Sequence, residues 1–125
     1  MQGGGRGRRR RGRRAVRMLE PVLLLLLQHD PAHGYTLLER LGEFGLAHLN
    51  PSAVYRMLRD MEERGWVAST WDEEQSQGPP RRVYQITTLG DEVLALWAQE
   101  LEESRERIDY LLAVYRRRME EVDGE

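Results

Sequence analysis

The sequence predicts a mainly α-helical chain that carries one small β-hairpin and ends in a long helix. Residues 50–67 have the pattern of a capped amphipathic helix, and residues 66–87 hold two segments rich in β-branched and aromatic side chains. Residues 88–121 contain an apolar stripe and no proline. With 125 residues the chain can form one compact domain with extensions, and it is too short for two full domains.

The stretch from residue 50 to residue 67 predicts the helix around which the chain is organised. Asn50 can cap this helix, Pro51 has no hydrogen bond to lose in the first turn, and Gly65 supplies a stop. Apolar and polar side chains separate at helical spacing. The apolar face holds Val54, Met57, Leu58 and Met61, the opposite face holds Ser52, Arg56, Arg59 and Glu63, and Tyr55 lies at the border. This pattern is typical of an ordinary surface helix and equally of a recognition helix that enters a major groove. The segments on either side of it are needed to distinguish the two interpretations.

Basic charge is concentrated at the N-terminal end. Eight arginines precede the first acidic residue, at positions 6, 8, 9, 10, 11, 13, 14 and 17, and the rest of the chain holds 11 arginines against 21 acids. The net charge of −2 therefore hides a balance of −10 outside the basic end. Residues 1–17 are expected to form a disordered glycine and arginine tail, which either binds nucleic acid phosphates or is simply solvated. Lysine is absent, so every permanently positive side chain is an arginine, whose guanidinium can contact phosphate or guanine. A bias in the base composition of the genome also explains this absence.

The apolar run from Val22 to Leu27 predicts a first helix. It imitates a secretory signal, but Glu20 and Pro21 interrupt it and no cleavage site follows. The run is also too short to cross a membrane, and we expect a cytoplasmic protein. The absence of cysteine excludes disulfides and is compatible with a reducing cytoplasm, but it does not fix the compartment. Because this helix is apolar on nearly all sides, we expect the side that does not face the domain to be buried by another element or a second chain.

A turn over residues 29–34 leads into a second helix that starts near Tyr35 and ends at Gly45. His29, Asp30 and His33 lie close together in the turn, but a metal site there lacks a fourth ligand. Capping or packing is the favoured role for these residues, and no cofactor is expected.

Two strands and a polar tip follow the organising helix. Residues 66–71 and 82–87 are the strands, and residues 72–81 between them are rich in polar residues, glycine and proline. Three helices followed by a hairpin, or wing, make a winged helix-turn-helix. Arg81 and Arg82 lie at the returning base of the wing, where they can contact phosphate or a minor groove, or remain ordinary surface residues.

Thr87 or Thr88 can cap a final helix that runs to about Glu121. At 1.5 Å per residue it is roughly 50 Å long, which is more than a small domain can cover. Its apolar stripe therefore predicts a homodimer, formed through Val93, Trp97, Leu101, Ile108, Leu111 and Tyr115. Trp97 is a candidate ligand platform as an alternative to a core role, because an aromatic side chain near a dimer axis can line a pocket for a small aromatic effector.

Three segments resemble the PadR family of transcriptional regulators, and together they cover about Val22 to Gly90. They read VLLLLLQHDPAHGYTLLERL, NPSAVYRMLRDMEERGWV and GPPRRVYQITTLG. The resemblance implies a winged-helix repressor that dimerises through its C-terminal helix and binds pseudo-palindromic operators in double-stranded DNA. It also implies that some relatives respond to small aromatic ligands.

The resemblance assigns roles to individual residues. Tyr35 resembles a phosphate-contacting residue, and Arg81 and Arg82 match the family's wing. Ser52, Tyr55 and Arg56 match the helix that reads DNA, and Arg59 joins them on the basic face of the predicted helix. Two features depart from the family pattern: the arginine tail is longer, and Trp66 stands where an aliphatic residue is usual.

The expected organisation is a tail over residues 1–17, a DNA-binding domain over residues 18–87 and a dimerisation helix over residues 88–125. An enzyme is disfavoured, because His29, His33 and His48 lack catalytic partners in the sequence and the acids follow exposed helix faces. The other interpretation is a winged-helix module that binds a ligand or a protein without specific DNA binding. The acidic balance of the chain keeps this interpretation open.

Overall fold

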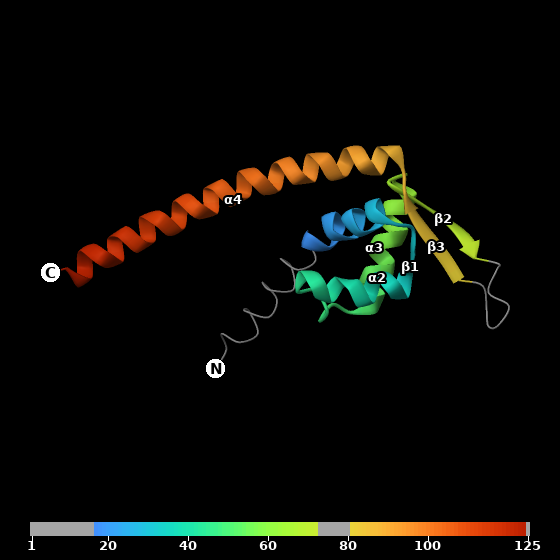
Figure 1. Ribbon diagram of the computed structural model, residues 1–125, viewed down its shortest axis with the longest axis horizontal. Helices are drawn as coiled ribbons and strands as arrows, with labels where there is room; N and C mark the ends of the chain where they lie inside the picture. The colour runs from blue at the N-terminus through green and yellow to red at the C-terminus, as the bar shows by residue number, and fades with distance from the viewer. Residues whose placement is uncertain (1–16, 73–80, 125) are drawn as a thin grey trace. The chain divides into compact units, whose positions relative to one another are not determined.

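The computed structural model describes residues 17–72 and 81–124 (Figure 1). The chain divides into two compact units between Leu94 and Ala95, and each unit is described by itself. Residues 1–16, which contain nearly all of the predicted tail, and residues 73–80, at the tip of the wing, lie outside the described residues. No helix in the described part is long and apolar enough to cross a membrane.

In its described residues the first unit contains four helical segments, a small sheet and the start of the last helix. A helix over residues 17–29 is followed by β1 (Ala32–His33), α2 (Gly34–Arg40), the 3-10 helix η1 (Leu41–Phe44), α3 (Pro51–Glu63), β2 (Val67–Asp72) and β3 (Arg81–Ile86). The three strands are antiparallel in the order β1-β3-β2 (Figure 1). This arrangement confirms the predicted fold class. Both wing strands differ by one residue from their predicted bounds, and β1 was predicted as part of a turn.

The core of this unit is built mainly from leucine. Its fully buried side chains are Leu19, Leu23, Leu24, Leu27, Leu37, Leu41, Val54, Leu58, Met61 and Val67. The expectation that the first helix leaves a whole apolar side uncovered is wrong. Of its large apolar side chains, only Met18 and Leu25 are exposed, at 40% and 44%.

Both ends of α3 form as the sequence predicts. The side-chain oxygen Oδ1 of Asn50 accepts a hydrogen bond of 2.9 Å from the Ser52 N–H, and Pro51 opens the helix. At the other end the N–H of Gly65 donates to the Glu62 carbonyl at 3.0 Å, and the N–H of Trp66 donates to the Met61 carbonyl at 2.9 Å. This pair of bonds is a Schellman motif, and it requires the left-handed backbone of Gly65, whose φ is 81°.

Thr87, rather than Thr88, caps the last helix, α4 (Thr88–Asp123). Its hydroxyl oxygen accepts from the Gly90 N–H at 3.0 Å and donates to the Gly65 carbonyl at 2.6 Å. The Thr87 N–H also donates to the Trp66 carbonyl at 3.0 Å. Thr87, at the start of α4, is therefore hydrogen-bonded to the backbone that follows α3.

The second unit is the remainder of α4, which continues without a break to Asp123. Ile108, Leu111 and Tyr115, which the sequence assigns to a dimer interface, are exposed, whereas Val93, Trp97 and Leu101 are half-buried. Tyr110 is the most exposed large apolar residue of the helix at 72%, and it was not part of the predicted interface. The distal helix thus presents more apolar surface than the predicted stripe contains.

Candidate nucleic-acid interface

The polar face of α3 is exposed, as predicted. Ser52, Arg56 and Arg59 lie on this face, and Tyr55 at its border is exposed as well. In the described part of the chain, no hydrogen bond or ion pair engages the side chain of Arg56 or Arg59. Their charges are therefore available to an anionic partner.

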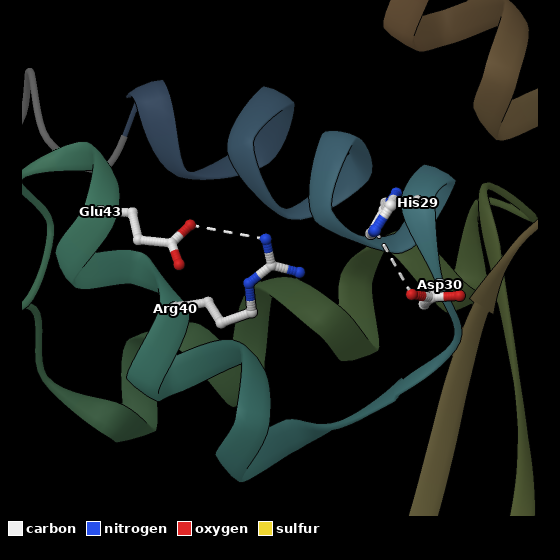
Figure 2. Close-up of polar contacts among 4 residues, drawn as sticks. All are labelled: His29, Asp30, Arg40 and Glu43. Carbon is white, nitrogen blue, oxygen red and sulfur yellow. Dashed lines mark hydrogen bonds and ion pairs between the residues drawn. The ribbon is translucent and has the colours of Figure 1, made fainter.

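Other arginines of the first unit are paired with acids. Arg40 contacts the Glu43 carboxylate at 3.4 Å, as Figure 2 shows, and Arg64 contacts Asp60 at 3.3 Å. Arg64 also lies over the ring of Trp66, 5.0 Å from its centroid. Arg40 and Arg64 are therefore already paired with an acid, whereas Arg56 and Arg59 are not.

Four predicted contact residues come together around one hollow of about 370 Å³. Tyr35 of α2, Tyr55 of α3 and Arg81 and Arg82 of β3 line it, together with His33, Gly34 and Tyr84. Two aromatic hydroxyls and two guanidiniums are groups that bind phosphate oxygens. The fold thus gathers residues from three separate segments into a surface with the chemistry of a backbone contact.

Arg81 is held by stacking rather than by an acid. Its guanidinium lies 5.0 Å from the centroid of the Tyr35 ring, and the His33 ring stacks with that of Tyr35, with centroids 5.8 Å apart and planes at 17°. A cation over an aromatic face is attracted by the ring without losing its charge. No acid pairs with Arg81 in the described part of the chain, so its charge can still act on a bound anion.

Arg82 has a different environment. Its Nη1 lies 3.5 Å from Oε1 of Glu62, and its guanidinium lies 4.9 Å from the Trp71 ring centroid. Tyr84, two residues further along β3, is buried, and burial raises the pKa of its hydroxyl while Arg82 opposes the shift. Adjacent arginines of one strand therefore meet different partners.

The turn residues considered for a metal do not gather around a common point. His29 contacts Asp30 at 3.5 Å on an exposed surface (Figure 2), whereas His33 lies on β1 with its Nε2 3.4 Å from Oδ2 of Asp72. In residues 17–72 and 81–124, no group of three histidine, aspartate or glutamate side chains is placed to hold a metal ion. His33 has the packing role that the sequence favoured, beside Tyr35.

Gly34 was not among the predicted site residues, yet it determines where Tyr55 lies. A Cβ atom at this position would be 2.5 Å from Cε1 of Tyr55 and 3.1 Å from its hydroxyl oxygen. The absent side chain is therefore what lets Tyr55 rest against the start of α2. No periodicity in the sequence signals this contact, because it joins two helices across a turn.

We expect Gly34→Ala to displace Tyr55 and to weaken DNA binding by about fivefold. The free energy of unfolding should fall by about 1 kcal/mol because the added methyl group overpacks the contact. The affinity is measured on a duplex by fluorescence anisotropy and the stability by thermal unfolding. In a Tyr55→Ala background the same glycine change should have little further effect on affinity, because the clashing ring is gone. Equal losses of affinity with and without the Tyr55 ring would contradict this account.

The order of helices and hairpin defines the chain as a winged helix-turn-helix protein, in which α3 carries two exposed arginines, Arg56 and Arg59. The profile of the Transcriptional regulator PadR-like family matches residues 22–96. The chain belongs to this family, whose members are transcription regulators and not enzymes. No curated protein matches the chain significantly.

Solved structures agree with this assignment. A PadR-like transcription factor from Bacteroides fragilis is 26% identical, with 81% of this chain and 96% of that chain covered and a TM-score of 0.68. A Thermoplasma acidophilum protein, provisionally assigned as a transcriptional regulator, is 32% identical, with coverage of 81% and 96% and a TM-score of 0.69. A PadR-like regulator from Bacillus cereus is 26% identical, with coverage of 75% and 90% and a TM-score of 0.67.

Proposed function

We propose that the chain is a homodimeric repressor that binds a pseudo-palindromic operator in double-stranded DNA. The observation that carries this proposal is the polar face of α3, where Arg56 and Arg59 are exposed and have no acidic partner in the described part of the chain. Both arginines can form two parallel hydrogen bonds to a guanine edge. Ser52, near the start of the helix, is small enough to let the backbone approach the groove.

Phosphate contacts would position this helix. The hollow between α2, α3 and β3 offers the Tyr35 and Tyr55 hydroxyls and the unpaired charge of Arg81. Such contacts fix the orientation of a protein on DNA without reading its sequence. We therefore propose that α3 reads the bases and that the hollow beside it contacts the phosphate backbone of the DNA.

Dimerisation is proposed from the distal part of α4. Ile108, Leu111 and Tyr115 are exposed on the part of α4 that forms the second unit, and a second copy would cover them. A symmetric pair of winged domains reads two half-sites related by a two-fold axis. Trp97 remains the candidate contact for a small aromatic effector at the dimer interface, and the cytoplasm is the expected compartment.

The test is selection of duplexes from a random library by the purified full-length chain. We expect one enriched motif with two inverted half-sites. Retention of duplexes without any enriched motif would favour the alternative, a winged-helix module that binds a ligand or a protein without specific DNA binding. The acidic residues that outnumber arginine outside the tail are the observation behind that alternative.

Arg56→Ala should cost about 1 to 3 kcal/mol on the selected operator and less on random DNA, because the variant cannot bind a base edge. Arg64→Ala is the matched control, since Arg64 lies at the far end of α3 and is already paired with Asp60. Its replacement should leave both affinities near the wild-type values. Equal losses on operator and random DNA for Arg56→Ala would reduce that residue to a phosphate contact.

Deletion of residues 1–14 removes seven arginines and should lower affinity for all duplexes alike. The slope of log affinity against log salt should flatten by about 0.9 for each phosphate that the shortened chain no longer neutralises. The ratio of operator affinity to random affinity should barely change, since contacts of arginine with phosphate carry no information about the base sequence. An unchanged slope would mean that the tail is only solvated, and a large loss of specificity would mean that it reads a minor groove.

A further inference from the structure

We propose that Arg82 is a positioning residue that braces the wing against α3, so that Arg81 alone makes the phosphate contact at the base of the wing. The inference rests on the DNA binding proposed above and refines it. It assigns different roles to two adjacent arginines that the sequence cannot distinguish.

The strand geometry separates the two side chains. Successive residues of a strand point to opposite faces of the sheet, and residues directly paired across two strands point to the same face. Arg82 is paired with Trp71 of β2, and Arg81 is paired with Asp72. Arg82 therefore shares a face with Trp71, whereas Arg81 shares the other face with Asp72.

On its own face Arg82 contacts the Tyr84 side chain and belongs to a connected group that we call the wing brace, made of Glu62, Ser69, Trp71 and Arg82. Oε1 of Glu62 lies 3.5 Å from Nη1 of Arg82, and Oε2 accepts a hydrogen bond of 2.6 Å from the Ser69 hydroxyl. Trp71 lies beneath the Arg82 guanidinium. Glu62 is in the last turns of α3, which packs beside β2 (Figure 1), so one carboxylate joins the proposed recognition helix to both strands of the wing.

The charge of the brace is already balanced. A phosphate that approached Arg82 would also approach the Glu62 carboxylate, and the attraction and repulsion would largely cancel. Both arginines line the hollow, but Arg81 forms no ion pair in the described residues: it lies over Tyr35, and Asp72, opposite it across the strands, contacts His33. A half-exposed ion pair contributes little free energy by itself, so the brace acts mainly through geometry, by fixing where the wing points relative to α3.

The geometry can be tested without DNA on the full-length chain labelled with ¹⁵N. The indole N–H signal of Trp71, assigned with a Trp71→Phe variant, should shift in both Glu62→Gln and Arg82→Gln. Arg81→Gln is the matched control and should leave that signal in place, because Arg81 points to the other face. A Trp71 signal that does not respond to Glu62→Gln would overturn the brace.

Binding to duplex DNA over a range of salt concentrations tests the roles. Arg81→Gln should flatten the salt slope by about 0.9, since the variant neutralises one phosphate fewer. Arg82→Gln and Glu62→Gln should keep the wild-type slope, and each should lower affinity for the selected operator several-fold, because each releases the wing from α3. Their effects should not add, since the two residues contact each other. The double variant should lose no more affinity than either single variant.

The Glu62 variant is the sharpest part of this test. If Arg82 contacted phosphate, removal of the carboxylate beside it would release its charge and raise affinity. A rise in affinity for Glu62→Gln, or a slope flattened by about 0.9 in Arg82→Gln, would overturn the assignment. If Arg82→Gln does not fold, Glu62→Gln still decides by the sign of its effect. A wild-type chain that binds no duplex would defeat the proposed function, and the indole measurement would still decide whether the brace exists.

Discussion

Leu111→Glu in the full-length chain is expected to convert the protein from a dimer to a monomer and to weaken operator binding by about 100-fold or more. Leu111 is 67% exposed on the distal part of α4, in the apolar stripe with Ile108 and Tyr115. A carboxylate there would have to be buried against a second copy, which costs several kcal/mol when no partner charge is present. The operator affinity falls because two linked domains bind two half-sites far more tightly than one domain binds one.

Sedimentation measures the state of association, and fluorescence anisotropy measures affinity for the operator and for a single half-site. Ala113→Glu is the matched control, since it adds the same charge to an exposed position off the stripe. It should leave both the dimer and the operator affinity intact. A wild-type chain that sediments as a monomer, or a Leu111→Glu variant that remains a dimer, would contradict the proposed interface.

Gly90→Ala is expected to destabilise the first unit by about 3 kcal/mol, the upper end of the cost of forced overpacking. A Cβ atom at this position would collide with the carbonyl oxygen of Trp66 and would lie 2.7 Å from Cγ1 of Ile86. The Trp66 oxygen is backbone and cannot rotate away. It also accepts a hydrogen bond of 3.0 Å from the Thr87 N–H and lies 3.0 Å from the Thr87 hydroxyl oxygen, whose one proton it shares with the Gly65 carbonyl, so relief of the collision would disturb the cap of α4.

Thermal and urea unfolding measure this loss, which should lower Tm by about 10 °C or more for a domain of this size. Gly42→Ala provides the control, because a Cβ there meets only the Cβ of Ala47, at 3.7 Å, in ordinary contact. That variant should unfold close to the wild-type temperature. A Gly90→Ala protein as stable as Gly42→Ala would show that the start of α4 can shift at little cost.

Features set by a few neighbouring residues could be predicted from the sequence. Asn50, Pro51 and Gly65 define the ends of α3 through local hydrogen bonds and backbone angles, and the structure shows those bonds. The polar face of α3 follows from helical spacing alone. The hairpin was predicted to within one residue, since β-branched and aromatic segments flank a polar tip.

Features that depend on pairing between distant segments could not be predicted. β1 has only two residues, and it exists because Ala32 pairs with Tyr84 and His33 pairs with Val83, far along the chain. The contact of Gly34 with Tyr55 and the ion pair of Glu62 with Arg82 are of the same kind. The sequence therefore predicts which residues are basic and exposed, but not which of them are already paired with an acid.

The alternation of Arg81 and Arg82 on β3 also bears on how the hairpin finds its register. A slip of one residue turns every side chain of a strand to the opposite face. A slip that brings Arg81 to the place of Arg82 would still put a guanidinium near Glu62, so the charges do little to distinguish that alignment from the native one, whereas the opposite slip would put Val83 there. Tyr84 does distinguish them, because it is buried and a slip would put Gln85 or Val83 in its place. Transfer of this wing to another scaffold must therefore preserve Tyr84 and its apolar site, whereas a second arginine gives no protection against misalignment.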